Sequence, residues 1–233
     1  MNWFKIFISG AVAFGMSIAV TVLIENLGGA LGSIIATIPS TIIPGVVIIL
    51  TEEGRTMDQR YDAIIACLYG MFGTCILFMP CWKVVPPLLP RKWTNGARIV
   101  ASVVISLVVW FTGAMVLILL QGVFNSMGLS TITYGILIMV VSVICGVCFC
   151  WYLPPTPAGK NKVKWYIYLA RGFMASCSIF ISGILSQTSS GAAAGAMSTF
   201  PAMFLTTMVS VSISQGPEVA VGAIGPLMMG GLV

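Results

Sequence analysis

Two prolines interrupt apolar stretches that are otherwise long enough to form membrane helices. Pro39 lies in "GSIIATIPSTIIPG", residues 32–45, and Pro201 lies in "AMSTFPAM", residues 196–203. A proline inside a helix removes one backbone hydrogen bond and clashes with the carbonyl four residues earlier. The carbonyls of Ile35 and Met197 are therefore freed. Inside a bilayer no water replaces the lost partner, so a freed carbonyl must be satisfied by protein or must line a polar cavity.

Hydroxyl side chains surround both prolines. They are Thr37, Ser40, Thr41, Ser198 and Thr199. Together with the freed carbonyls they would form a neutral, oxygen-rich site for a small polar solute or a hard monovalent cation. In the alternative interpretation the hydroxyls bond back to their own helices. The prolines would then only bend the helices, since proline is common in membrane helices. The sequence leaves both interpretations open.

Three ionisable residues fall inside or at the ends of apolar segments, where such groups are usually functional. They are Glu25, Arg171 and Glu218. Arg171 could form an ion pair with either acid and take part in coupling, or it could bind an anionic group. Alternatively, its long side chain could extend to the membrane interface.

The composition indicates an integral membrane protein with many spans. The 233 residues are 58% hydrophobic and only 7% charged, whereas soluble domains carry roughly 25% charged residues. The chain has no histidine, and no metal-ligand spacing or phosphate-binding glycine loop is present. We therefore expect no enzyme activity, no cofactor and no metal. The net charge of +5 comes from short loops, so nucleic acid is not an expected partner.

Hydropathy predicts an all-α fold of about eight transmembrane segments, since each span needs about 20 apolar residues. The predicted segments are 3–25, 28–50, 61–80, 97–121, 131–153, 164–187, 190–213 and 217–233. Proline-rich, basic stretches at 81–98 and 154–164 are expected to be linkers outside the membrane.

Lysine and arginine are concentrated in those two linkers, which the positive-inside rule places in the cytoplasm. With eight crossings, the N-terminus then lies outside. If segments 28–50 and 190–213 were instead re-entrant, the same count would place the N-terminus inside.

A shift of 162 positions aligns the start of the chain with its end, and 10 of the first 54 positions are identical. The identical pairs include Trp3/Trp165, Gly10/Gly172, Gly29/Gly191, Thr37/Thr199 and Pro39/Pro201. Five crossings separate the two copies, so they would lie in the membrane with opposite orientations. Inverted three-helix repeats with interrupted helices meeting near the midplane are a common plan of secondary transporters. The predicted organisation is a first repeat at 1–80, a central helix pair at 81–163 and a second repeat at 164–233.

The "IPST" and "FPAM" segments also carry a family resemblance. Residues 28–75 and 190–231 resemble small GlpM-type inner-membrane proteins, which have about three helices. The resemblance implies a duplicated and fused three-helix unit with two further helices between the copies. It implies no particular activity.

These observations favour a transporter or permease for a small polar solute or ion, with its site at the two proline-interrupted helices. The alternative is a non-transporting structural or assembly subunit of a membrane complex. The expected partners are the lipid bilayer and the solute, together with further copies of the chain or other subunits.

Overall fold

The computed structural model describes residues 3–27, 42–51, 56–90, 92–152, 164–188, 191–214, 220, 221, 224 and 228. Over these residues the fold is helical and contains no strand. The helices are α1 (Trp3–Leu27), α3 (Ile42–Thr51), α4 (Met57–Phe72), α5 (Met79–Leu88), α6 (Asn95–Ser126), α7 (Thr131–Tyr152), α8 (Trp165–Thr188), α9 (Gly191–Ser198) and α10 (Ala202–Ser214). A π-helical segment, Gly73–Phe78, joins α4 to α5.

Within the described part of the chain, four helical stretches are long and apolar enough to cross a membrane. They are Met57–Leu88, Asn95–Ser126, Thr131–Cys148 and Trp165–Leu185. Large apolar side chains on α6, such as Val108, Phe111 and Leu119, are more than half exposed. Such a surface is stable in lipid rather than in water. The protein is therefore an all-helical, membrane-embedded protein, as the composition predicts.

Most of the predicted apolar segments coincide with helices. The segments at 3–25, 97–121, 131–153 and 164–187 correspond to α1, α6, α7 and α8. The segment at 190–213 is split into α9 and α10. Residues 28–41 and most of 217–233 lie outside the described part of the chain.

The first half of the predicted linker at 81–98 is helical, because the helix continues to Leu88. Pro80 disrupts only the helical turn before it, and the wider π-helical segment accommodates that disruption. The continued helix buries Trp82 and Val85. Its end is capped when Arg98 Nη2 donates a 2.7 Å hydrogen bond to the carbonyl of Pro86, one of the carbonyls that a helix end leaves free.

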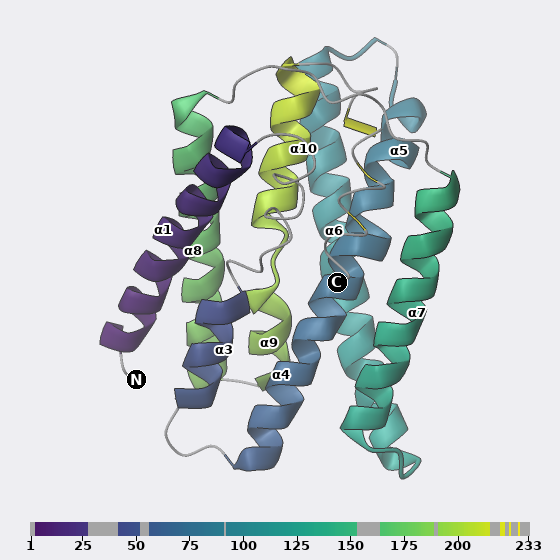
Figure 1. The fold of residues 1–233 in the computed structure, drawn as a ribbon. Coiled ribbons are helices and arrows are strands. Elements are labelled where there is room, and N and C mark those ends of the chain that lie inside the picture. The colour runs from purple at the N-terminus through teal and green to yellow at the C-terminus, as the bar shows by residue number, and fades with distance from the viewer. Residues whose placement is uncertain are drawn as a thin grey trace.

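The helices pack as a bundle in which segments distant in sequence lie side by side (Figure 1). Helices α1 and α8 are in extensive contact, as are α4 and α9. A Cβ added to Gly10 would lie 3.1 Å from Ser176 Oγ, and one added to Gly172 would lie 2.9 Å from a ring carbon of Phe14. Because higher numbers on α1 face lower numbers on α8, the two helices run antiparallel.

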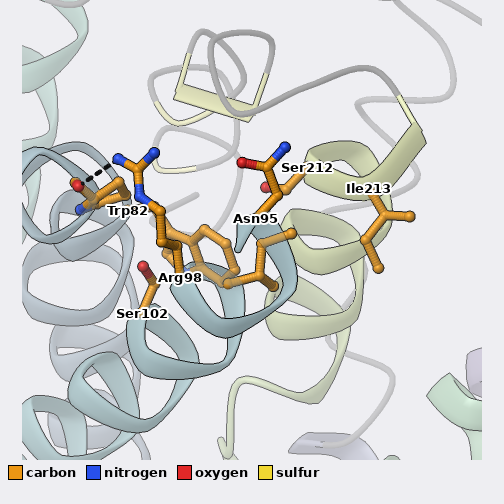
Figure 2. A pocket seen from close by; sticks show the side chains of 8 residues that line it. Trp82, Asn95, Arg98, Ser102, Ser212 and Ile213 are labelled. Carbon is orange, nitrogen blue, oxygen red and sulfur yellow. Dashed lines mark hydrogen bonds between the residues drawn. The ribbon is translucent and has the colours of Figure 1, made fainter. Parts of the chain in front are cut away.

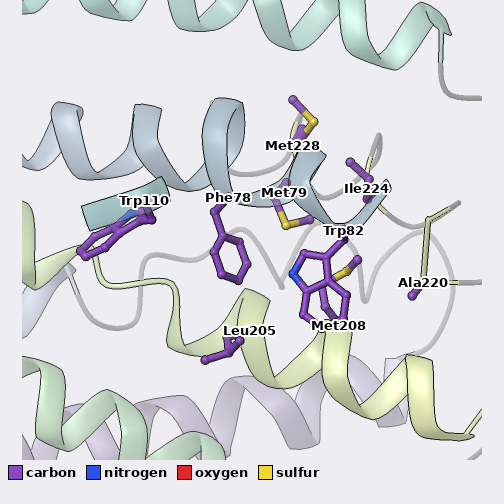
Figure 3. Packing of buried hydrophobic residues seen from close by; sticks show 9 residues of the cluster. All are labelled: Phe78, Met79, Trp82, Trp110, Leu205, Met208, Ala220, Ile224 and Met228. Atoms are coloured by element: carbon purple, nitrogen blue, oxygen red, sulfur yellow. The ribbon is translucent and has the colours of Figure 1, made fainter. Parts of the chain in front are cut away.

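Among the described residues, the largest apolar cluster lies between α5, α6 and α10 and includes residues near the C-terminus (Figure 3). It contains Phe78, Met79, Trp82, Trp110, Leu205, Met208, Ala220, Ile224 and Met228. The last three recur at every fourth position, the spacing of one helical face. This cluster fixes α10 against α5 and α6.

Helices α4 and α9 approach so closely that glycine is required at their contact. A Cβ on Gly195 would overlap the carbonyl of Ala63, and a Cβ on Gly70 would overlap the side chain of Thr199. Small residues allow membrane helices to pack backbone against backbone. Gly195 belongs to the small-residue pair with Gly191 that precedes Pro201 in the sequence.

We predict that Gly195→Ala lowers the free energy of unfolding by about 1–3 kcal/mol or more, because the new methyl group meets backbone that cannot move aside. Gly15→Ala and Gly122→Ala are matched controls, since a Cβ at either site meets nothing within 4 Å. Both controls should hold or slightly raise stability, because alanine is the better helix former. Melting curves in detergent measure the difference, and equal melting for Gly195→Ala and the controls would contradict the close contact.

Candidate functional site

Helix α9 ends at Ser198 and α10 begins at Ala202, so the chain is interrupted at Pro201 as the sequence predicts. The interruption is a tight turn. The amide of Thr199 donates to the carbonyl of Ala196 at 3.2 Å, and the amide of Phe200 donates to the carbonyl of Met197 at 3.1 Å. These are three-residue bonds, which commonly close the last turn of a helix.

The carbonyl of Met197, predicted to be freed by the proline, has a second donor from another helix. Ser178 Oγ on α8 donates to it at 3.0 Å. One turn earlier, Ser182 Oγ donates to the carbonyl of Ala194 at 2.7 Å. Two hydroxyl groups of α8 thus donate hydrogen bonds to backbone carbonyls of α9.

The hydroxyls next to Pro201 bond back to their own helix in this conformation. Ser198 Oγ donates to the carbonyl of Gly195, and Thr199 Oγ1 donates to that of Ala196, both at 2.7 Å. Both side chains are buried, as is Pro201. Cys67 Sγ on α4 lies 3.4 Å from Ser198 Oγ. The second half of the predicted site is therefore closed in the described conformation.

The interruption lies against the π-helical segment. Thr74 Oγ1 donates to the carbonyl of Gly70 at 2.9 Å and lies 3.4 Å from the carbonyl of Thr199, which is a longer second acceptor. Trp110 Nε1 on α6 is 3.1 Å from the Gly70 carbonyl and 3.0 Å from Thr74 Oγ1. Its ring packs edge-on against Phe200 with centroids 5.5 Å apart. The α9–α10 interruption and the π-helical segment of a continuous helix thus meet at one buried group of polar atoms.

The other half of the predicted site lies outside the described residues. It comprises Ile35, Thr37, Pro39, Ser40 and Thr41. The segment that follows it does reach α9, because a Cβ on Gly45 of α3 would overlap the Cβ of Ser198.

Arg171 is buried within the bundle, with only 5% of its surface exposed. Its Nη2 donates a 3.0 Å hydrogen bond to Thr207 Oγ1 on α10. The side chain of Glu25 and the whole of Glu218 lie outside the described part of the chain, so pairing with either acid stays a prediction.

A second polar region, which the sequence did not reveal, is a cavity of about 190 Å³ between α5, α6 and α10 (Figure 2). Its walls are formed by Trp82, Pro86, Asn95, Arg98, Ile99, Ser102, Ser212 and Ile213. One signal was present: Arg98, Ser102 and Ser106 recur at every fourth position in an apolar segment and so share one helix face.

At the opposite end of α6, Gln121 joins α4 to α7. Its Nε2 lies 3.3 Å from both Asp62 Oδ1 and Thr131 Oγ1. Within the described residues, no three histidine, cysteine or acidic side chains are grouped so that they could hold a metal ion.

Comparison with family models, curated proteins and solved structures finds no match to this chain. The function is therefore inferred from the sites themselves.

We predict that Thr207→Val destabilises the protein by about 1.5 kcal/mol or more, because a buried guanidinium loses a charge-assisted hydrogen bond. Ser142→Ala is the control, since among the described residues that buried hydroxyl bonds only to its own helix, at the Ile138 carbonyl. Denaturation in mixed micelles measures both. If Thr207→Val and the control lower the free energy of unfolding equally, the hydrogen bond between Arg171 and Thr207 contributes nothing specific to stability.

Proposed function

We propose that this membrane-embedded protein is a transporter or permease for a small polar solute or a monovalent cation, with the α9–α10 interruption forming half of its site. The observation that supports this is the contact between the α9–α10 interruption and the π-helical segment Gly73–Phe78 inside the bundle. Interrupted helices at membrane depth are typical of transporter sites, and π-helical segments often occur at functional sites. In this proposal the described conformation is a closed state.

Binding would require only small rotations of the side chains at the interruption. The hydroxyls of Ser198 and Thr199 now donate to α9 carbonyls. Rotation about one side-chain bond would direct the same oxygens toward a ligand. The carbonyl of Met197 would contribute a further oxygen, as helix breaks do in sodium- and proton-coupled transporters.

The proposal includes an inverted repeat with eight crossings and basic loops in the cytoplasm. The packing of α1 on α8 supports the repeat, because the matched residues Gly10 and Gly172 both lie at that antiparallel contact. The matched pair Ala13 and Ala175 is also buried. A two-fold axis in the membrane plane would place equivalent residues of two copies at one such contact.

The second candidate is a structural or assembly subunit. The observation that favours it is the full set of internal partners at the interruption, together with the wide apolar faces of α6 and α7. The two candidates differ in whether water reaches the interruption during function.

We predict that Pro201→Ala keeps stability while permeation falls, because the restored amide would compete with Phe200 N and Ser178 Oγ for the Met197 carbonyl and make that oxygen less available to a solute. Thr199→Val should lower permeation in the same way, by removing a hydroxyl at nearly constant volume. Thr133→Val on α7 serves as the control. Stopped-flow light scattering of proteoliposomes against urea, glycerol and sodium or potassium salts measures permeation. Destabilised variants with unchanged activity per molecule would contradict the proposal and favour purely structural bends.

Cys67 is a native reporter of water access, because its Sγ lies 3.4 Å from Ser198 Oγ, next to the α9–α10 interruption. We expect a protein that retains only this cysteine to react slowly but completely with a small, membrane-impermeant methanethiosulfonate in liposomes. Reaction after unfolding in dodecyl sulfate defines the complete value. A thiol that reacts only after unfolding would support the structural subunit instead.

A further inference from the structure

The cavity between α5, α6 and α10 contains an unusual number of polar atoms that lack hydrogen-bond partners. Among the described residues, none donates to or accepts from Trp82 Nε1, Arg98 Nε, Ser102 Oγ or Ser212 Oγ, and all four atoms are buried. Trp82, Ser102 and Ser212 are only 3%, 1% and 7% exposed. A buried donor without a partner is costly, so these atoms indicate that the cavity is normally occupied.

The cavity walls select the charge of the occupant. An arginine and a tryptophan can only donate hydrogen bonds, whereas serine and asparagine can donate or accept. Among the described residues that form the walls there is no carboxylate. The first turn of α6, capped by Thr94, also lies at this end, and a helix N-terminus favours negative charge. The walls therefore match an anionic acceptor and would repel a cation.

An oxyanion matches this site better than water alone. A cavity of about 190 Å³ has room for several waters or for one tetrahedral oxyanion. Water could satisfy the hydroxyls and the indole, whereas an oxyanion would also neutralise the charge of the half-buried Arg98. Nη2 of Arg98 is held by the carbonyl of Pro86 at 2.7 Å, so the guanidinium is fixed in position.

The cavity also opens toward the outside of the bundle. Ile213, which forms part of its wall, is 70% exposed, and Asn95 lies at the exposed start of α6. The site is thus close to the end of the membrane-spanning helices, where both lipid headgroups and dissolved ions are accessible.

We propose that this cavity is a binding site for a phosphate-type oxyanion, either free or as the phosphate of an anionic lipid. Arg98 supplies the charge, and Trp82, Ser102 and Ser212 donate hydrogen bonds to the oxygens. The proposal is independent of transport, because a structural subunit could bind an anion in the same way.

Two probes distinguish the sources of the anion. Inorganic phosphate is titrated into delipidated protein in neutral detergent, and the melting temperature is recorded. Phosphatidylglycerol is offered in mixed micelles, with phosphatidylcholine as the zwitterionic comparison, and bound lipid is counted by native mass spectrometry. Stabilisation by inorganic phosphate identifies a free anion, and selective retention of phosphatidylglycerol identifies a lipid. If neither probe binds to the wild-type protein, the proposal is wrong.

Variants then locate the binding. Arg98→Gln should weaken binding of the responding probe about tenfold or more, since a charge-assisted hydrogen bond is lost. Lys83→Gln is the matched control, because it removes the same charge from an exposed position on α5. If both variants weaken binding equally, the anion is held by general surface charge and the proposal fails.

The serine variants test the site even if Arg98→Gln does not fold. Ser102→Ala and Ser212→Ala should each weaken binding roughly three- to tenfold. Without the anion they should be as stable as the wild type or more stable, because each removes a buried hydroxyl that lacks a partner. Wild-type affinity in both variants would exclude this cavity as the site.

Discussion

The fold depends on a small set of hydrogen bonds in which Trp110 Nε1 contacts the Gly70 carbonyl and Thr74 Oγ1. Interrupted helices inside a membrane leave backbone groups that water cannot reach, so the protein must supply every partner. Trp110 and Thr74 do so at the π-helical segment, and Ser178 does so at the α9–α10 interruption. Backbone carbonyls at the π-helical segment and at the α9–α10 interruption thus receive hydrogen bonds from side chains of neighbouring helices.

The close packing of α4 against α9 follows from the same need for hydrogen-bond partners within the protein. Thr74 can approach the carbonyl of Thr199 only because Gly70 leaves room for the Thr199 side chain, and Gly195 leaves room for the backbone of α4. A side chain at either glycine would separate the two interrupted helices. Since Thr74 Oγ1 of the π-helical segment contacts the carbonyl of Thr199 at the α9–α10 interruption, we expect a change at one to alter the other. This coupling is the physical basis for proposing a transport site there.

Part of this arrangement could be predicted from the sequence and part could not. Local signals predicted the helical segments and the break at Pro201, because length, apolar character and the missing proline amide act within a few residues. The π-helical segment was not predicted, and the predicted apolar segment 61–80 ends before the helix does, at Leu88. The partners of Met197 and the cavity around Arg98 arise when separate helices pack together, which no local pattern specifies. The first half of the site, around Pro39, stays a prediction.

Amide hydrogen exchange in lipid nanodiscs tests the coupling of the two interruptions most directly. The comparison is between the wild type and Trp110→Phe, which keeps a ring near Phe200 but loses the indole donor. We expect faster exchange in both 70–78 and 196–203, with the contact between α1 and α8 unchanged. Faster exchange in 70–78 alone would show that the interruptions are independent, and would contradict the account.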